Sequence, residues 1–542
     1  MRRYETQAVV IGGGATGCGV LRDLSLRGIK AILVERDDIA SGATGGNHGL
    51  LHSGARYAVK DPESAAECIH ENRILRKIAR HCIEPTGGLF VSLPEDDPSY
   101  AETFSAACRA AGISCDRLSV KEALSIEPNI NPSITAACRV PDGSVDPFRL
   151  VSANLLDAKE HGGLALLHTE VTGFIFEQGR IAAVKCFDRR AKEDVELRCD
   201  IVVNASAAWG KRICAMANID LPLLPSKGSL IIMDYRVNGI VVNRLRAPGD
   251  ADIIVPGDTV SLIGTTSITA ADDELDSLTV TDREIDILLS EGTKLIPSLR
   301  SHRILRAFCG VRPLVQSGHS ADGRAVSRGI ALLDHAADGV GNFITITGGK
   351  LMTYRLMAQQ ACDLVSEKLA LKTKCTTHKT PLPGSETRHA RKIKRMKDFT
   401  GIANLVVGST FYRHGQRVFD ILSKDRKNYQ LICECEMVTA GEVDYAIRTL
   451  DAANLLDLRK RTRIGMGPCQ GELCSYRAAG LFCEYAGTTA DEAVGMLRDY
   501  LEERFRGVKP VLWGDALKEA EFSYWIYQDL MGLGSIAEGE PQ

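Results

Sequence analysis

Three glycines in the spacing G-x-G-x-x-G constrain the fold of this chain more than any other feature. Gly12, Gly14 and Gly17 follow one apolar run, and a helical stretch and a second apolar run then lead to Glu35. The first glycine permits a sharp turn, the second lets the backbone approach a pyrophosphate, and the third lets a helix pack close to a strand. The helix N-terminus offers free N–H groups to an anion, and a carboxylate after the second strand accepts from ribose hydroxyls. Residues 1–36 therefore predict a dinucleotide-binding β-α-β unit, with a ligand-free turn as the alternative.

Length and charge restrict the class of protein. The chain has 542 residues, a formal net charge of −3 and 17 cysteines. This length predicts two or three domains, and the charge gives no reason to expect nucleic acid or direct attraction to anionic lipid. We find no apolar run of about 18 residues and expect no secretory signal, because the first strand begins almost at once. The cysteines are not typical of a disulfide framework and indicate a reducing cytosol.

A second glycine-containing turn occurs late in the chain, in "NFITITGGKLMTYR" (342–355). We expect a strand that returns beside the first strand, a turn at Gly348 and Gly349 that approaches a flat ring, and a helix starting near Leu351. The positive end of that helix would stabilise the negative charge that a reduced flavin carries. A simple NAD-binding domain does not require so late a return, so the two turns together favour FAD over NAD.

The remaining segments predict a large first domain and a smaller C-terminal part. "SLIIMDY" (229–235) and "VSLIGTTS" (260–267) predict strands of a sheet on the substrate side. The stretch 199–210 predicts a buried strand that breaks into a turn of small residues. A polar, basic, proline-containing stretch after residue 372 marks a boundary. The expected divisions are a dehydrogenase domain, a linker with a helical segment, a cysteine-bearing domain and a helical tail: 1–372, 373–428, 429–486 and 487–542.

Four cysteines in the C-terminal part form two close pairs. Cys433 and Cys435 have C-x-C spacing, and Cys469 and Cys474 have C-x₄-C spacing. Four thiolates in two pairs suit a [2Fe–2S] cluster or a structural Zn²⁺, and the small residues of "GMGPCQG" let backbone N–H groups approach sulfur. "TAGE" (439–442) matches a capping box and predicts a helix after the first pair. We expect [2Fe–2S], because a dehydrogenase that passes electrons onward needs a one-electron relay; zinc and four merely buried cysteines are the alternatives.

Several motifs resemble, in order, those of the FAD-dependent glycerol-3-phosphate dehydrogenases over residues 5–365. They are the first glycine turn with Glu35, "TGGNHGLLHSGARY", "VVNASAAW", "IGTTS", "GVRPL" and "GGKLMTYR". The cysteine region is similar to the bacterioferritin-associated-ferredoxin-like domain, as in the large catalytic subunit of the bacterial anaerobic enzymes. The resemblance implies an α/β fold: a Rossmann-type FAD-binding domain with an interleaved antiparallel substrate-side sheet, as in D-amino-acid oxidase, and a small helical C-terminal iron–sulfur module.

The resemblance also implies site residues. His52 and Arg312 match catalytic positions, with His52 as the candidate base or flavin-orienting group. Such groups suit the oxidation of a secondary alcohol, which needs a proton acceptor beside flavin N5, the hydride acceptor; arginine suits a phosphate. The substrate-binding positions are Arg56, Arg328, Lys350 and Thr353. The cofactor-binding positions are Gly12, Gly14, Gly17, Glu35, Ser41, Thr44, Val171, Ala205, Trp209, Gly348, Gly349 and Lys350, and the metal-binding positions are Cys433, Cys435, Cys469 and Cys474.

The function implied is the oxidation of sn-glycerol 3-phosphate to dihydroxyacetone phosphate. Electrons would leave FAD through the [2Fe–2S] cluster to an FMN-bearing subunit, a membrane-associated iron–sulfur subunit and, indirectly, menaquinone in anaerobic respiration. Partner subunits would hold the chain on the cytoplasmic face of the bacterial inner membrane. The alternative on the same scaffold is an FAD-dependent amine or amino-acid oxidoreductase subunit, such as one acting on sarcosine, D-amino acids or opines. The arginines placed for phosphate argue against it. A non-catalytic assembly subunit is a further alternative, and the arginines together with His52 argue against that.

Overall fold

The first sheet has a parallel centre of buried strands rich in valine and isoleucine. In the computed structural model, which describes residues 1–315, 329–386, 403–422 and 425–534, this centre has the order β20-β12-β1-β2-β9. β10 and β11 extend the sheet antiparallel beside β12, and β19 pairs antiparallel with β20. The strands are β1 (Arg2–Ile11), β2 (Ala31–Val34), β9 (Leu164–Leu166), β10 (Thr169–Glu177), β11 (Arg180–Asp188), β12 (Glu193–Asn204), β19 (Ile330–Asp334) and β20 (Phe343–Gly348).

The late strand β20 lies beside β12, and the prediction that it returns beside the first strand is wrong. β12 is 12 residues long and pairs with β1 from Val195 to Asn204. Its other edge pairs first with β11 and then, from Val202, with β20. The long β12 therefore occupies the edge of β1, and β20 adds one position further out. The turn and helix follow as expected, since β20 ends at Gly348 and leads through η5 (Leu351–Thr353) into α8 (Tyr354–Lys368).

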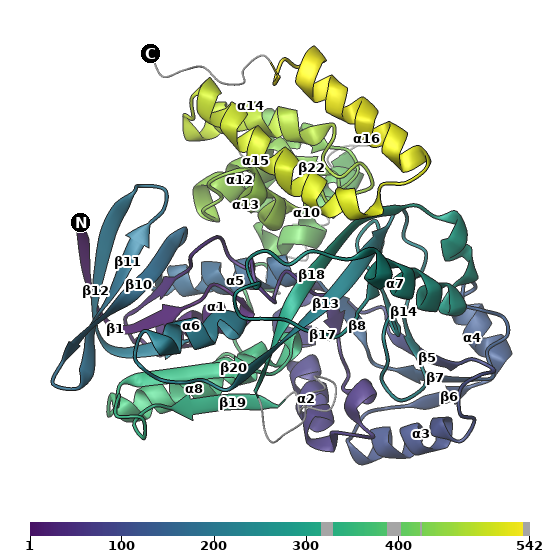
Figure 1. Cartoon of the computed structure of the whole chain (residues 1–542), viewed down its shortest axis with the longest axis horizontal. Helices are drawn as coiled ribbons and strands as arrows, with labels where there is room; N and C mark the ends of the chain where they lie inside the picture. The colour runs from purple at the N-terminus through teal and green to yellow at the C-terminus, as the bar shows by residue number, and fades with distance from the viewer. Residues whose placement is uncertain (316–328, 387–402, 423–424, 535–542) are drawn as a thin grey trace.

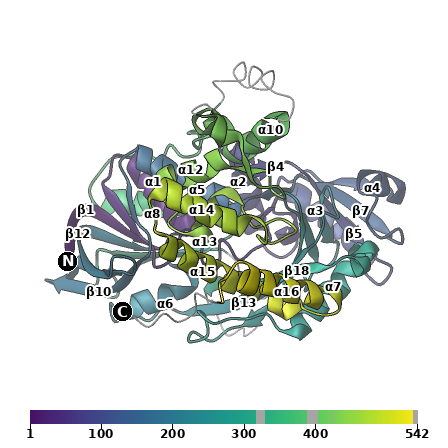
Figure 2. The ribbon, with the colours of Figure 1, turned by 90° about the horizontal axis from the view of Figure 1, so that it is seen from above.

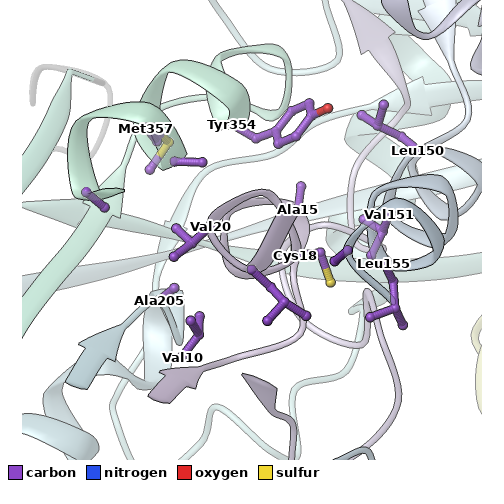
Figure 3. Close-up of a cluster of buried hydrophobic side chains, with 14 of the residues drawn as sticks. Val10, Ala15, Cys18, Val20, Leu150, Val151, Leu155, Ala205, Tyr354 and Met357 are labelled. Atoms are coloured by element: carbon purple, nitrogen blue, oxygen red, sulfur yellow. The ribbon is translucent and has the colours of Figure 1, made fainter. Parts of the chain in front are cut away.

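One helix after the first glycine turn packs between two others. α1 (Ala15–Leu26) contacts α5 (Pro147–Glu160) and α8. Asp146 caps α5 by accepting from the backbone N–H groups of Phe148 and Arg149, with Pro147 at the first helical position. Figure 3 shows the buried side chains that join the three helices to the sheet: Val10, Ala15, Cys18, Val20, Leu150, Val151, Leu155, Ala205, Tyr354 and Met357. This packing fixes where the N-terminus of α1 points.

The second sheet is mainly antiparallel and carries the predicted substrate-side strands. Its order is β17-β13-β16-β15-β14-β5-β7-β6, and β18 pairs with the other edge of β13. The two predicted strands fall in β13 and β16, which pair antiparallel, so this expectation is confirmed. The strands are β5 (Gly88–Ser92), β6 (Asp116–Leu118), β7 (Ala136–Val140), β13 (Leu223–Met233), β14 (Val241–Arg244), β15 (Ile253–Pro256), β16 (Ser261–Gly264), β17 (Ile268–Thr269) and β18 (Ile304–Val315).

Helices cover the second sheet, and a small third sheet lies near the junction. The covering helices are α3 (Tyr100–Ala110), α4 (Val120–Ile126) and α7 (Asp282–Leu295). α2 (Pro62–Ile78) packs against α3 and η5, and α6 (Gly210–Ala215) follows β12. The third sheet consists of β3 (Leu50–Leu51), β8 (Gly143–Val145) and β4 (Ile83–Glu84). β3 leads directly into the loop that carries His52 and Arg56.

The C-terminal part is a helical unit that lies over the junction of the two large sheets (Figures 1 and 2). One hydrophobic core runs from Ile432 to Leu533, so the cysteine-bearing region and the later helices pack together. The elements are α10 (Ala403–His414), α11 (Val418–Leu422), β21 (Leu431–Cys433), β22 (Val438–Thr439), α12 (Ala440–Thr449), α13 (Leu455–Thr462), α14 (Cys474–Ala486), α15 (Ala490–Val508) and α16 (Asp515–Trp525). A capping box of Thr439 and Glu442 starts α12, as "TAGE" predicted.

Arg463 joins this unit to helix α5 and to the second sheet. It follows α13, and its Nη1 lies 3.1 Å from Asp146, the cap of α5. Its Nε lies 2.8 Å from Asp258, in the turn between β15 and β16, and 3.0 Å from Glu436, next to Cys435. Three carboxylates from three parts of the fold therefore meet one guanidinium, which fixes the C-terminal unit in place.

Candidate active site

The first glycine turn forms a cradle that only glycine can occupy. Gly12 has a positive φ of 111°, and a Cβ atom there would lie 2.7 Å from the Ala205 carbonyl oxygen. A Cβ atom at Gly17 would lie 1.9 Å from the Gly12 carbonyl oxygen. The turn before α1 therefore carries no side chains at these positions. Ala15 and Thr16, the first residues of α1, line a cavity of about 700 Å³. A bare loop with a helix N-terminus facing a cavity fits the pyrophosphate of FAD.

Glu35 lies at the end of β2 and faces the same turn. Its Oε2 accepts from the Gly13 N–H at 2.6 Å, and its Oε1 accepts from the Asp37 N–H at 2.8 Å. Burial raises the pKa of this carboxyl, against these two backbone hydrogen bonds. The remaining lone pairs of the carboxylate suit the ribose hydroxyls of a dinucleotide.

The other predicted cofactor residues lie around the cradle. Thr44 Oγ1 accepts from the Ala15 N–H at 3.0 Å and lines the cavity. Ser41 instead accepts a hydrogen bond of 2.8 Å from Lys460 in the C-terminal unit. Trp209 donates from Nε1 to Asp276 at 2.8 Å. Val171 and Ala205 are buried in the first sheet and at its end.

The cavity also gathers the predicted substrate-side residues. His52, Arg56, Arg312, Gly348, Gly349 and Lys350 all line it. The topology explains this, because β3 brings the loop of His52, β18 brings Arg312, and β20 ends at the Gly348 turn. Side chains from both sheets therefore meet in one space beside the glycine cradle.

Arg56 combines a fixed position with spare donor capacity. Its Nη2 donates to the buried Asp252 carboxylate at 3.0 Å, and Asp252 also accepts from Arg246. Arg56 Nη1 is buried and has no hydrogen-bond partner among the described residues. A buried guanidinium nitrogen without a partner is costly unless a ligand supplies the acceptor, so this atom fits an anion in the cavity. No sequence motif indicated Asp252.

Arg312 is held by polar groups of the second sheet. Its guanidinium donates to Ser226 Oγ at 3.2 Å, to the Thr266 carbonyl oxygen at 3.1 Å and to Thr265 Oγ1. These contacts hold the guanidinium in place at the cavity wall.

An aromatic cluster surrounds His52. Asn72 fixes its backbone by donating to the His52 carbonyl oxygen at 3.0 Å. The His52 ring lies 5.3 Å from the Tyr57 ring and 6.1 Å from the His48 ring, centroid to centroid. Lys350 Nζ lies 4.6 Å above Tyr57, a cation–π contact. His48 and Tyr57 line the cavity but were missed from the sequence, although both stand in the quoted motif "TGGNHGLLHSGARY".

One predicted substrate residue, Thr353, lies away from the cavity. Thr353 is fully buried and, within the described chain, is not part of the cavity lining. Its Oγ1 accepts from the Lys350 N–H at 2.9 Å, so it positions Lys350 at the helix start. Arg328 lies outside the described residues.

The four cysteines converge from two segments, one that begins at the end of β21 and one that ends at the start of α14. Cys433 hydrogen-bonds with Cys474, which lowers the pKa of Cys433 to about 7, and Cys435 contacts Cys469. Backbone N–H groups of Gly465 and Cys469 donate to these sulfurs. A Cβ atom at Gly467 would lie 2.5 Å from the Cys435 Cβ. Small residues thus bring backbone donors to sulfur, as the sequence predicted.

The spacing of the sulfurs fits two metal ions better than one. In the described part of the chain, no three of these cysteines have sulfur atoms that all lie within 4.8 Å of one another. Four thiolates on a single tetrahedral Zn²⁺, with Zn–S bonds of about 2.3 Å, would all satisfy that limit. Two separate sulfur pairs suit the two irons of a [2Fe–2S] cluster.

Comparison with known proteins matches both halves of this geometry. Residues 7–355 match the FAD dependent oxidoreductase family (DAO), and residues 431–484 match the BFD-like [2Fe-2S] binding domain. Over 530 residues the chain is 54% identical to the A subunit of the anaerobic glycerol-3-phosphate dehydrogenase of Escherichia coli (strain K12), covering 98% of this chain and 97% of that protein. The Haemophilus influenzae protein of the same name is 50% identical, with 98% and 94% covered.

The chain belongs to the family of anaerobic glycerol-3-phosphate dehydrogenase A subunits.

A solved structure supports the fold. The glycerol-3-phosphate dehydrogenase from Bacillus halodurans, complexed with FAD, superposes with a TM-score of 0.70 at 22% identity, covering 94% of this chain and 96% of that one. The predicted family, the FAD-binding α/β fold and the C-terminal iron–sulfur domain are therefore confirmed. In the part of the chain that the structure describes, no helix is both long and apolar enough to cross a membrane.

Proposed function

We propose that this chain oxidises sn-glycerol 3-phosphate to dihydroxyacetone phosphate. The observation that carries the proposal is the single cavity of about 700 Å³ in which Arg56, Arg312, Lys350 and His52 meet beside the glycine cradle. Three cationic side chains suit a phosphate dianion, and an imidazole beside them suits proton transfer.

Each residue has a separate task in the proposed reaction. The substrate alcohol loses a hydride from carbon and a proton from oxygen; FAD, when bound, supplies the hydride acceptor. His52 accepts the hydroxyl proton. Arg56, through its spare Nη1, and Arg312 bind the phosphate oxygens and so orient the alcohol carbon. Lys350, held over Tyr57, adds positive charge at the helix start.

The C-terminal unit has the role of an electron relay in this proposal. Electrons leave one at a time through the four-cysteine site and pass to two partner subunits. One of these subunits carries FMN, and the other is a membrane-associated iron–sulfur subunit. The electrons finally reach menaquinone. Partner subunits hold the chain at the cytoplasmic face of the inner membrane. The proposal is supported by the names of the relatives, each of which is one subunit of a larger enzyme. It is also supported by the segment Gly46–His48, which lines both the active-site cavity and a second cavity beneath the iron–sulfur module.

Anaerobic flavin bleaching tests the substrate. The purified chain, loaded with FAD, is mixed with sn-glycerol 3-phosphate, sarcosine or D-alanine while the flavin absorbance is followed. We expect rapid bleaching by glycerol 3-phosphate alone. Bleaching by sarcosine or D-alanine, with no response to glycerol 3-phosphate, would replace the proposal by the amine or amino-acid oxidoreductase alternative.

A further inference from the structure

The C-terminal segment exposes many large apolar side chains. Trp513, Leu517, Phe522, Trp525 and Leu530 are each 51–84% exposed. They lie on or beside α16 and the short π-helix Ile526–Leu530 that follows it, at the outer edge of the molecule in Figure 1. Single exposed apolar residues are ordinary, but so dense a set within one short segment indicates an interaction site. Tryptophan and phenylalanine are also typical of protein interfaces.

The opposite side of this segment is bound to the loop that carries two of the cysteines. Tyr527 is buried, donates to the Glu472 carbonyl oxygen and lies 2.9 Å from Ser475 Oγ, hydroxyl to hydroxyl. Ser523, also buried, donates to the Glu472 carboxylate. The segment is therefore a fixed part of the iron–sulfur module rather than a loose tail.

The end of the same loop and the first turn of α14 add two further exposed apolar residues. Leu473 and Tyr476 are 63% and 53% exposed and stand on either side of Cys474 in the sequence. Together with the five residues of the C-terminal segment they form what we call the apolar face. The apolar face therefore includes the sequence neighbours of Cys474, and its helix α16 lies at the outer edge of the molecule (Figure 1).

We propose that the apolar face docks a partner protein that takes electrons from the iron–sulfur cluster. The inference rests on the proposed function, which requires that electrons leave this module. Residues 509–534 contain two lysines and four carboxylates, a net charge of −2. The matching surface is therefore an apolar recess with a rim of lysine and arginine side chains.

The same charges argue against two other occupants. A helix that lies on an anionic membrane carries lysine and arginine on its polar face, whereas this segment is acidic. A second copy of the chain would bring two acidic segments together, and like charges across an interface oppose association. The observations thus favour a basic electron-accepting protein.

Charge insertion into the apolar face provides the test. The full-length tagged chain is co-expressed with the flavin-bearing and iron–sulfur-bearing subunits of its enzyme, as wild type and as the double variant Phe522→Glu, Trp525→Glu. We expect recovery of the partner subunits to fall at least about tenfold, as for loss of an interface hot spot. Leu517→Glu, a second variant at an exposed position, should act in the same direction. Phe176→Glu, at a 42% exposed site on β10, is the matched control and should retain the partners.

Measurements on the chain alone separate the outcomes. The variants should keep wild-type FAD and iron contents, and the chain should neither float with vesicles of phosphatidylethanolamine and phosphatidylglycerol nor dimerise in sedimentation velocity. Undiminished partner recovery in both variants would overturn the proposal. Vesicle binding or dimerisation that the variants abolish would overturn it in favour of a membrane or a second copy.

The test is independent of the substrate. If glycerol 3-phosphate fails to bleach the flavin but the variants lose their partners, the proposed function fails and the docking surface stands. If bleaching is normal and the partners stay bound, only the docking surface fails.

Discussion

Arg461 of α13 and Asp38 of the loop after β2 form a buried bidentate ion pair. Arg461 Nη1 lies 2.9 Å from Asp38 Oδ2, and Nη2 lies 2.6 Å from Oδ1; the side chains are 0% and 2% exposed. Burial alone would raise the pKa of Asp38, but Arg461 and Lys460 hold it well below its usual range. The pair joins a loop beside the FAD cradle to the helix that leads to the second pair of cysteines.

Asp38→Asn should destabilise the attachment of the iron–sulfur module. The substitution leaves a buried guanidinium without its counter-charge, and breaking such a pair costs about 3–5 kcal/mol. Chemical denaturation measures the loss of unfolding free energy. Because the folded-state pKa of Asp38 is depressed, the contribution is present at neutral pH and is lost as the pH falls through that folded value. Asp444→Asn, which breaks the exposed pair with Arg448, is the control and should change stability by less than about 1 kcal/mol.

Arg56→Ala should raise KM for glycerol 3-phosphate by roughly 10–100-fold, and much less for glycerol. The substitution removes a charge-assisted contact of about 1.5–3 kcal/mol to the phosphate. Arg246→Ala is a matched control, because Arg246 pairs with the same Asp252 but is absent from the described cavity lining. Equal losses for the two substrates, or equal effects of the two variants, would remove Arg56 from the phosphate site.

Replacing both Cys469 and Cys474 by serine should remove the iron while substrate still reduces FAD. The two changes delete half of the sulfur ligands, and the flavin site lies upstream in another part of the fold. Iron and sulfide analysis, the electron paramagnetic resonance (EPR) spectrum and quinone reduction are the readouts, and quinone reduction should fall. Cys483→Ser, at a half-buried cysteine of α14, should keep the iron. Iron-free wild-type protein that still reduces quinone would contradict the relay.

Arg504→Gln should lower the midpoint potential of the cluster. Arg504 is 8% exposed, and its Nε and Nη1 have no hydrogen-bond partners among the described residues. It lines a cavity of about 60 Å³ with Cys469. Reduction of the cluster adds negative charge, which the Arg504 cation stabilises. Loss of this charge in Arg504→Gln should therefore lower the midpoint potential by roughly 40–90 mV, or about 1–2 kcal/mol at an effective dielectric constant near 20.

An EPR-monitored redox titration measures that shift. Arg504→Lys should have a midpoint potential close to that of wild type, because lysine keeps the positive charge. Arg506→Gln, whose side chain is 71% exposed, is the control. Equal potentials for wild type and Arg504→Gln would show that Arg504 only supports the packing.

Mild acid should destabilise the fold through His81. Burial lowers the pKa of His81 to about 3, with help from His414 and Arg149. The unfolded chain binds a proton near pH 6.5 and the folded chain does not, so stability falls between pH 7 and pH 5 by about 2 kcal/mol for this group. Between pH 7 and pH 5, the denaturation midpoint of His81→Asn should depend less steeply on pH than that of wild type. The exposed His378→Asn should keep the wild-type slope.

Local features of the fold could be predicted from the sequence, because a few neighbouring residues determine them. The Gly12 turn and the Thr439 cap are of this kind. The place of β20 could not be predicted, because it depends on which sheet edge the long β12 occupies. The partner of Arg56, Asp252, is 196 residues away, and Asp38 and Arg461 are 423 residues apart. No short pattern records such pairings, so the sequence located the arginine but not the carboxylate that holds it.

The contacts of Arg463 set an order for biosynthesis. Its carboxylate partners Asp146 and Asp258 leave the ribosome long before Arg463 itself, and domains made first fold first. The receiving surface is therefore complete before the last quarter of the chain emerges. Glu436, the third partner, arrives with the module, next to Cys435. The dehydrogenase part of the chain thus provides a preformed surface, and the module docks on it last through Arg463.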